Sequence, residues 1–219
     1  MNKQIIYVGD PVCSWCYAFT ETFEMIKKEF WGKVGFSYYM GGLVINRDVK
    51  INAAMKRLLK KNWKEVESKT GKYIKAFEKI DDAREMPYIS DPACRAFMCV
   101  KSIDEELAYS FYKRVHKAFY EELKDIAHET TLCDIACEVG IEASFFIEKF
   151  RHKDTEDQVY KGMDKVADLG VRAFPALVAM DESGAKVLNQ GTRACAPLMA
   201  QIQSWVRGDM SAGEMLPVL

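Results

Sequence analysis

The chain has 219 residues, which is enough for one large domain or for one domain that carries an insertion. Apolar residues make up 49% of it and charged residues 29%, a composition that excludes disordered, collagen-like and low-complexity proteins. The 31 basic and 32 acidic residues leave a net charge of -1, so no overall field attracts nucleic acid or an anionic membrane. We therefore expect neither as a partner.

The lengths of the apolar segments predict the cellular compartment. No stretch approaches the roughly 18 apolar residues of a transmembrane helix. The apolar run 5–8, before Asp10 and Pro11, is also too short for the core of a signal peptide. We therefore expect a cytoplasmic protein. In a reducing compartment, its seven cysteines indicate catalysis, metal binding or packing in preference to a disulfide scaffold.

The first 45 residues are predicted to form a strand, a helix and a second strand. Residues 4–8 are β-branched and aromatic and stop at a Gly-Asp-Pro turn, which is typical of a short buried strand. From Cys16 to about Gly32, apolar residues recur every three or four positions, as on one face of a helix. Residues 34–44 alternate in polarity and predict the second strand.

The remaining chain divides into a helical middle and a mixed end. From about residue 46 to 168 the apolar period is helical, and we expect helices to stop at Gly71, Gly140 and Gly170. Pro87 and Pro92 are expected to bracket a loop ahead of a helix over residues 95–101. Strands are predicted over 176–180 and 186–189, followed by a last helix that ends at Gly208.

The central motif is Cys13-Ser14-Trp15-Cys16, located where the first strand ends and the first helix begins. A thiol at a helix N-terminus faces unsatisfied N–H groups and the positive end of the helix dipole, which favour the thiolate. Cys13 is therefore the expected nucleophile. Cys16 lies one turn further and is expected to resolve a mixed disulfide at Cys13.

The other cysteines are interpreted as packing residues, and we expect no metal site. A lone Cys-x-x-Cys can be half of a zinc site, but the chain has no second pair with that spacing. Cys133 and Cys137 are four residues apart, near His128, so a metal site there is conceivable. Small buried thiols are common in helical cores, and packing is the preferred interpretation. The remaining thiols are Cys94, Cys99 and Cys195.

A second segment, Val171-Arg172-Ala173-Phe174-Pro175, places a proline directly before the predicted strand 176–180. A cis Phe174-Pro175 bond would direct backbone polar groups toward Cys13 and let a peptide substrate pair alongside. Only about 5 to 6% of X-Pro bonds are cis, so the proline by itself favours trans. The thiol motif earlier in the same order of strands and helices raises the expectation that this bond is cis.

The order of these motifs resembles the DsbA-like branch of the thioredoxin superfamily. Residues 10–17 are similar to the active-site segment of its FrnE-like and disulfide-isomerase-like members, and residues 170–177 are similar to their cis-proline loop. Parts of the middle region also resemble the family, namely 92–96, 118–121, 125–126, Leu132 and 140–141.

The resemblance implies an α/β thioredoxin fold with a large all-helical insertion between a βαβ half and a ββα half. The expected parts are residues 1–45, 46–168 and 169–219. It also implies thiol-disulfide exchange through Cys13 and Cys16, with Pro175 in the cis form. The founding periplasmic oxidases have a histidine between the cysteines, whereas this chain has Ser14 and Trp15. We therefore expect weaker oxidising power here.

Four other residues are weighed for a role in catalysis. Asp10 is a candidate to accept the proton of Cys16, but the preferred interpretation is a turn residue before Pro11. His116, His128 and His152 lie in charged helical surroundings and are expected on the solvated surface.

The predicted function is that of a thiol-disulfide oxidoreductase of the reductase or isomerase type. Its partners would be protein or peptide disulfides and an unidentified thiol electron donor, with no cofactor except glutathione as a possible co-substrate. Trp15, Tyr17, Phe174 and Pro175 are expected to contact substrate. The first alternative is a glutathione-dependent isomerase or transferase of the kappa-like branch, whose members have serine at the position of Cys13. The second alternative is a metal or persulfide carrier.

Overall fold

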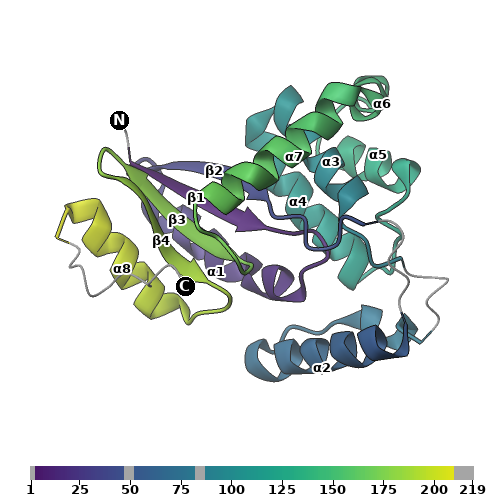
Figure 1. Cartoon of the computed structure of the whole chain (residues 1–219), viewed down its shortest axis with the longest axis horizontal. Helices are drawn as coiled ribbons and strands as arrows, with labels where there is room; N and C mark the ends of the chain where they lie inside the picture. Colours follow the sequence, from purple (N-terminus) through teal and green to yellow (C-terminus); the bar gives the residue numbers. More distant parts are fainter. Residues whose placement is uncertain (1–2, 47–51, 82–86, 210–219) are drawn as a thin grey trace. The chain divides into compact units, whose positions relative to one another are not determined.

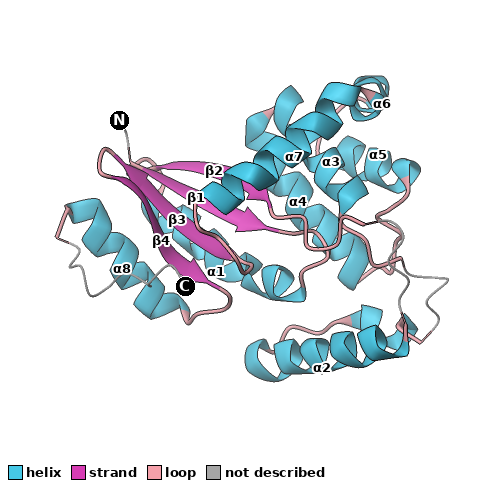
Figure 2. Ribbon diagram, viewed as in Figure 1, coloured by secondary structure: helices cyan, strands magenta, loops and turns pink. Residues whose placement is uncertain are grey.

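The computed structural model describes residues 3–46, 52–81 and 87–209. Along the chain the elements are β1 (Gln4–Gly9), α1 (Ser14–Phe30), β2 (Gly35–Met40), α2 (Ala53–Thr70), the 3-10 helix η1 (Lys75–Lys79), α3 (Asp91–Ile103), α4 (Glu105–Tyr120), α5 (Glu129–Glu138), α6 (Ala143–Arg151), α7 (Lys153–Asp168), β3 (Ala176–Asp181), β4 (Gly184–Gln190) and α8 (Cys195–Arg207). The predicted order, strand-helix-strand, then helices, then two strands and a helix, is confirmed (Figure 2).

The chain forms two compact units. The first contains residues 1–9, 19–41 and 162–219, and the second contains residues 10–18 and 42–161. The four strands belong to the first unit, and the helices from α2 to α6 belong to the second (Figure 1). The expected boundaries near residues 46 and 168 stay a prediction about domain organisation.

The sheet of the first unit has the strand order β2-β1-β3-β4. β1 pairs with β2 in parallel, which the intervening α1 permits, and with β3 antiparallel. β3 and β4 form an antiparallel hairpin with an irregularity in register at Leu177 and Val178. The fold is therefore the α/β thioredoxin arrangement that the family resemblance implied.

Both faces of this sheet are covered by helices. Alternate residues of each strand point to opposite sides, so one strand contributes to both buried faces. On one side, Ile6 and Val8 of β1 pack with Val166 of α7. On the other side, the ring of Tyr7 lies 4.5 Å from that of Phe23 in α1, centroid to centroid. The near-continuous apolar sequence of β1 follows from this double burial.

The second strand is shorter than the predicted 34–44. β2 ends at Met40, the Gly41 N–H still donates to the Gly9 carbonyl oxygen of β1 at 2.8 Å, and Leu43 and Val44 then bond to side chains. The Leu43 N–H donates to the Asp10 carboxylate, with 2.6 Å between N and Oδ2. The Val44 N–H donates to the Ser90 hydroxyl, with 2.8 Å between N and Oγ. Apolar alternation alone could not show that these backbone groups have side-chain partners.

Helix ends in the second unit follow local signals. Asn52 caps α2, its Oδ1 accepting the Met55 N–H at 3.0 Å, and Gly71 ends that helix with a φ of 69°. The predicted stops at Gly140 and Gly170 are also confirmed, each two residues beyond the end of its helix, α5 or α7. The expected loop up to Pro92 is wrong, because α3 begins at Asp91 and Pro92 lies in its first turn, where proline is tolerated.

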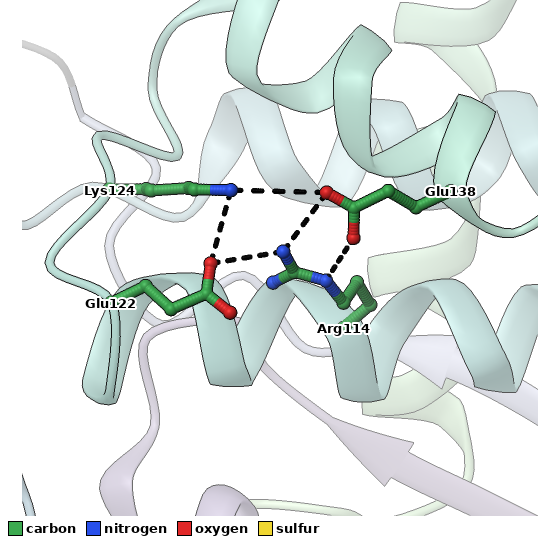
Figure 3. A network of polar contacts seen from close by, with 4 residues as sticks. All are labelled: Arg114, Glu122, Lys124 and Glu138. Carbon is green, nitrogen blue, oxygen red and sulfur yellow. Dashed lines mark hydrogen bonds and ion pairs between the residues drawn. The ribbon is translucent and has the colours of Figure 1, made fainter.

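Polar side chains join α4 to α5 within the second unit. Arg114 of α4 pairs with Glu138 at the end of α5 and with Glu122, and Lys124 contacts the same two carboxylates (Figure 3). The Arg114 side chain is only 18% exposed, so this network is partly shielded from solvent. It stabilises the end of α4, the helix that contacts the cysteine motif.

Candidate active site

Cys13 lies directly before α1, whose first residue is Ser14. The Cys13 carbonyl accepts the N–H of Tyr17 at 3.0 Å, so Cys13 is the N-cap residue of the helix. Its sulfur accepts the backbone N–H of Cys16, with 3.4 Å between N and Sγ. The helix N-terminus therefore provides a hydrogen-bond donor to the sulfur expected to carry negative charge.

The two sulfurs of the motif have different surroundings. Cys13 keeps 6% of its surface exposed, whereas Cys16 is fully buried, and neither is in a disulfide. Burial raises the pKa of Cys16 well above its usual range, and the neighbouring Cys13 adds to this increase. Cys16 is therefore a protonated thiol at neutral pH, and Cys13 is the more accessible sulfur.

Asp10 forms the turn that its sequence position suggested, and its carboxyl group is buried. Its Oδ1 accepts the Val12 N–H at 2.9 Å, which is the side-chain turn expected of this residue. The carboxyl group is also completely buried, and this burial raises its pKa from 3.8 to about 6 despite its hydrogen bonds. Its Oδ2 lies 3.9 Å from the sulfur of Cys94. A titratable carboxyl group therefore lies in the turn that leads to Cys13.

The backbone of that turn is held by side chains of the helical unit. The hydroxyls of Tyr88 and Tyr120 both donate to the Val12 carbonyl oxygen, at 2.7 and 2.5 Å. The hydroxyl of Tyr112 donates to the Asp10 carbonyl oxygen at 3.3 Å. No pattern in the sequence indicated a role for these three tyrosines.

The expected surface position of His116 is wrong, because the side chain is 1% exposed. Its Nε2 lies 3.1 Å from the Asp10 carbonyl oxygen. Burial lowers the pKa of His116 to about 4, so the ring is neutral at physiological pH. Tyr112, His116 and Tyr120 recur every four residues on α4, and this spacing is the signal that would have placed them on one face. His128 and His152 are exposed, as predicted.

The aromatic residues of the motif contact lysines at the end of α2. Trp15 is half-buried, and the Lys69 Nζ lies 5.7 Å from its ring centroid. Tyr17 is buried, its hydroxyl donates to Glu121 at 2.9 Å, and the Lys72 Nζ lies 4.9 Å from its ring centroid. Of the two, Trp15 has more surface available to a substrate.

Phe174 and Pro175 belong to the first unit, directly before β3. The peptide bond between them is cis. Pro175 is buried and Phe174 is half-buried against the core of that unit. A Cβ added to Gly41 would lie 1.9 Å from the Phe174 Cζ, so the ring occupies the space that a side chain at residue 41 would need.

The five remaining cysteines differ in exposure. Cys94, Cys99 and Cys133 are buried, which agrees with the packing interpretation, whereas Cys137 is exposed and Cys195 is half-buried. Among residues 3–46, 52–81 and 87–209, no three His, Cys, Asp or Glu side chains are arranged to hold a metal ion. Within these same ranges, no helix has the length and apolar character needed to cross a membrane.

Comparisons with known proteins agree with this arrangement. The family model of the DSBA-like thioredoxin domain matches residues 4–194. The structure of a "putative protein disulfide isomerase" from Nitrosomonas europaea has a TM-score of 0.84 and 25% identity, covering 95% of this chain and 99% of that one. The cytosolic disulfide reductase DsbM from Pseudomonas aeruginosa has a TM-score of 0.76 and 19% identity, covering 93% and 98%. No curated protein sequence matches the chain significantly.

Proposed function

Since the chain belongs to the family of DSBA-like thioredoxin domains, we propose that it is a disulfide reductase or isomerase that acts on protein or peptide disulfides. The observation that carries this proposal is the asymmetry of the two thiols. Cys13 Sγ accepts a helix N-terminal hydrogen bond and is partly exposed, whereas the Cys16 thiol is buried with a raised pKa. This difference supports attack by Cys13 and resolution by Cys16.

The proposed reaction has two exchange steps. The Cys13 thiolate attacks one sulfur of a substrate disulfide, the S–S bond breaks, and the first substrate thiolate leaves and takes up a proton. The Cys16 thiol then loses its proton and attacks Cys13 Sγ, releasing the second substrate thiol. The substrate disulfide is reduced to two thiols, and Cys13 and Cys16 are oxidised to one disulfide. A thiol electron donor reduces that disulfide in return.

A reducing or isomerising direction is favoured by the residues between the cysteines. Ser14 is buried and Trp15 is half-buried, and neither side chain carries a positive charge that would stabilise the Cys13 thiolate. A less stabilised thiolate makes the reduced form less favourable and lowers the potential. We also propose a cytosolic setting, in which the cysteines of this chain would be kept as thiols.

Glutathione is a suitable co-substrate for this site. The ammonium group of Lys69, which also pairs with Glu65 at 2.6 Å, lies beside the ring of Trp15, and that of Lys72 lies beside the ring of Tyr17. These cations attract the carboxylates of a thiol such as glutathione as its sulfur approaches Cys13. DsbM from Pseudomonas aeruginosa, which has 20% identity and a TM-score of 0.73 in this form, was solved with glutathione.

Trapping of mixed disulfides tests the proposed function. Cys13→Ser should abolish disulfide reduction, whereas Cys16→Ser should retain attack and accumulate a mixed disulfide that mass spectrometry detects. Cys137→Ser, which replaces an exposed cysteine of α5, is the matched control and should behave like the wild type. Full activity of Cys13→Ser would overturn the proposal, and a glutathione-dependent isomerase or transferase activity in that variant would support the kappa-like alternative.

A further inference from the structure

Two backbone carbonyls in front of Cys13 receive hydrogen bonds from four side chains. The Val12 carbonyl accepts from the hydroxyls of Tyr88 and Tyr120, at 2.7 and 2.5 Å. The Asp10 carbonyl interacts with the Tyr112 hydroxyl at 3.3 Å and with the His116 Nε2 at 3.1 Å, and it also accepts the Cys13 N–H at 3.1 Å. The turn is therefore bound by side chains distant in sequence.

Three of these side chains come from one face of α4. Residues 112, 116 and 120 are spaced by four, so they lie above one another along the helix. Tyr88 reaches the same turn from the segment before α3. Tyr112, His116 and Tyr120 are each at most 2% exposed and Tyr88 is 8% exposed, so water competes little for these carbonyls. The helical unit therefore holds the turn in one conformation.

On the basis of the proposed function, we propose that Tyr88 and Tyr120 are positioning residues that set the redox potential of the Cys13–Cys16 pair. The Val12 carbonyl carbon is bonded to the nitrogen of Cys13, so the negative end of this carbonyl dipole is only a few bonds from the Cys13 sulfur. The two hydroxyl hydrogens offset that negative end when Cys13 is a thiolate. In the disulfide form Cys13 carries no charge, so the hydroxyls stabilise the reduced form selectively.

Both phenols remain neutral donors at physiological pH. Burial raises the pKa of Tyr88 and of Tyr120 well above the usual value, and negative charge on Cys13 or Asp10 raises both further. Since Cys13 influences both phenols, they lie within electrostatic range of its sulfur. The ionisable groups near the turn include Cys16, Asp10, His116 and Cys94, and we expect Tyr→Phe substitution to leave all four in place.

The test is the redox equilibrium of Tyr88→Phe, Tyr120→Phe and the double variant with glutathione. Each single variant keeps one hydroxyl on the Val12 carbonyl, so we expect a change of about twofold or less. The double variant should favour the disulfide form by about three- to tenfold relative to the wild type, since the thiolate loses both donors. Tyr160→Phe, on the exposed side of α7, is the matched control.

A purely structural role would lower the stability of the double variant without moving this equilibrium. A folded double variant whose equilibrium constant lies within twofold of the wild type, or shifts toward the dithiol form, would overturn the inference. Should the double variant not fold, the single variants Tyr88→Phe and Tyr120→Phe must each shift the equilibrium toward the disulfide form relative to Tyr160→Phe, and a shift of either toward the dithiol form would overturn the inference. Absence of any redox couple in the wild type would instead contradict the proposed function.

Discussion

The imidazole of His116 faces the backbone carbonyl oxygen of Asp10, with 3.1 Å between Nε2 and that oxygen. A carbonyl only accepts hydrogen bonds, so the proton of the neutral ring is assigned to Nε2. His116 lies in α4, more than a hundred residues from the turn that it contacts. This contact joins the helical insertion to the segment that carries the cysteine motif.

His116 is expected to stabilise the protein at neutral pH and not in acid. Its pKa is lowered from 6.5 to about 4 in the folded state, so the unfolded chain binds a proton in a range where the native state does not. The stability that depends on neutral His116 is present above pH 6.5 and is lost as the pH falls toward 4, by up to about 3 kcal/mol. His116→Gln should remove this part of the pH dependence of denaturant unfolding. An unchanged slope between pH 4 and 6.5 would contradict the assignment.

Asp10 should have the opposite effect over nearly the same range. Its pKa is raised from 3.8 to about 6, so the native state holds the proton more tightly than the unfolded chain. The contribution of protonated Asp10 is present below pH 3.8 and is lost as the pH rises through 6, by up to about 3 kcal/mol. We therefore expect the two contributions to nearly cancel in the wild type.

Asp10→Asn should reveal the contribution of His116 to the pH dependence of stability. The amide cannot accept from both the Val12 and the Leu43 N–H, so the variant is less stable at every pH. Its free energy of unfolding should also rise from pH 4 to 6.5 more steeply than that of the wild type. Parallel profiles for the two proteins would show that Asp10 titrates normally.

Gly41→Ala should force the Phe174 ring out of its position. The new Cβ would lie 1.9 Å from the Phe174 Cζ, and overpacking of this kind costs about 1 to 3 kcal/mol. In a Phe174→Ala background the same change should cost much less, and a double-mutant cycle measures the difference. Gly162→Ala, in α7, is the control. Its new Cβ would lie 3.8 Å from the Tyr39 ring, an ordinary contact distance, and alanine should stabilise the helix relative to glycine. Additive costs in the cycle would exclude the steric explanation.

Lys69 and Lys72 should favour negatively charged disulfides. Replacing both with Gln is expected to slow oxidation of the reduced protein by glutathione disulfide about three- to tenfold, with little effect on the uncharged hydroxyethyl disulfide. Lys61→Gln with Lys64→Gln is the matched control on α2, since Lys61 lies roughly 12 Å along the helix from Lys69. Equal effects on both disulfides would rule out a role for charge.

The sequence predicted the elements near the site better than the contacts between them. Residues 4–8 and the apolar stripe from Phe19 to Phe30 correctly indicated β1 and α1, because burial of strand and helix faces leaves a periodic pattern. The order β2-β1-β3-β4 depends on long-range pairing, which local periodicity does not show.

The site itself was predicted only where the chemistry is local. The position of Cys13 at a helix start follows from neighbouring residues, and so does the turn at Asp10. His116 was misplaced because a histidine among lysines usually indicates a solvated surface, whereas its partner is a backbone carbonyl that no side-chain pattern reveals. Tyr88 and Tyr120 were missed for the same reason.

A redox titration of the purified protein against glutathione buffers, with the free thiols counted by alkylation at each point, tests the central claim most directly. The account predicts one two-electron couple that involves Cys13 and Cys16 and is absent from Cys13→Ser. Its potential should lie between about -270 mV, as in thioredoxin, and about -180 mV, as in protein disulfide isomerase. A wild-type protein without such a couple, or with one that persists in Cys13→Ser, would contradict the assignment of this pair.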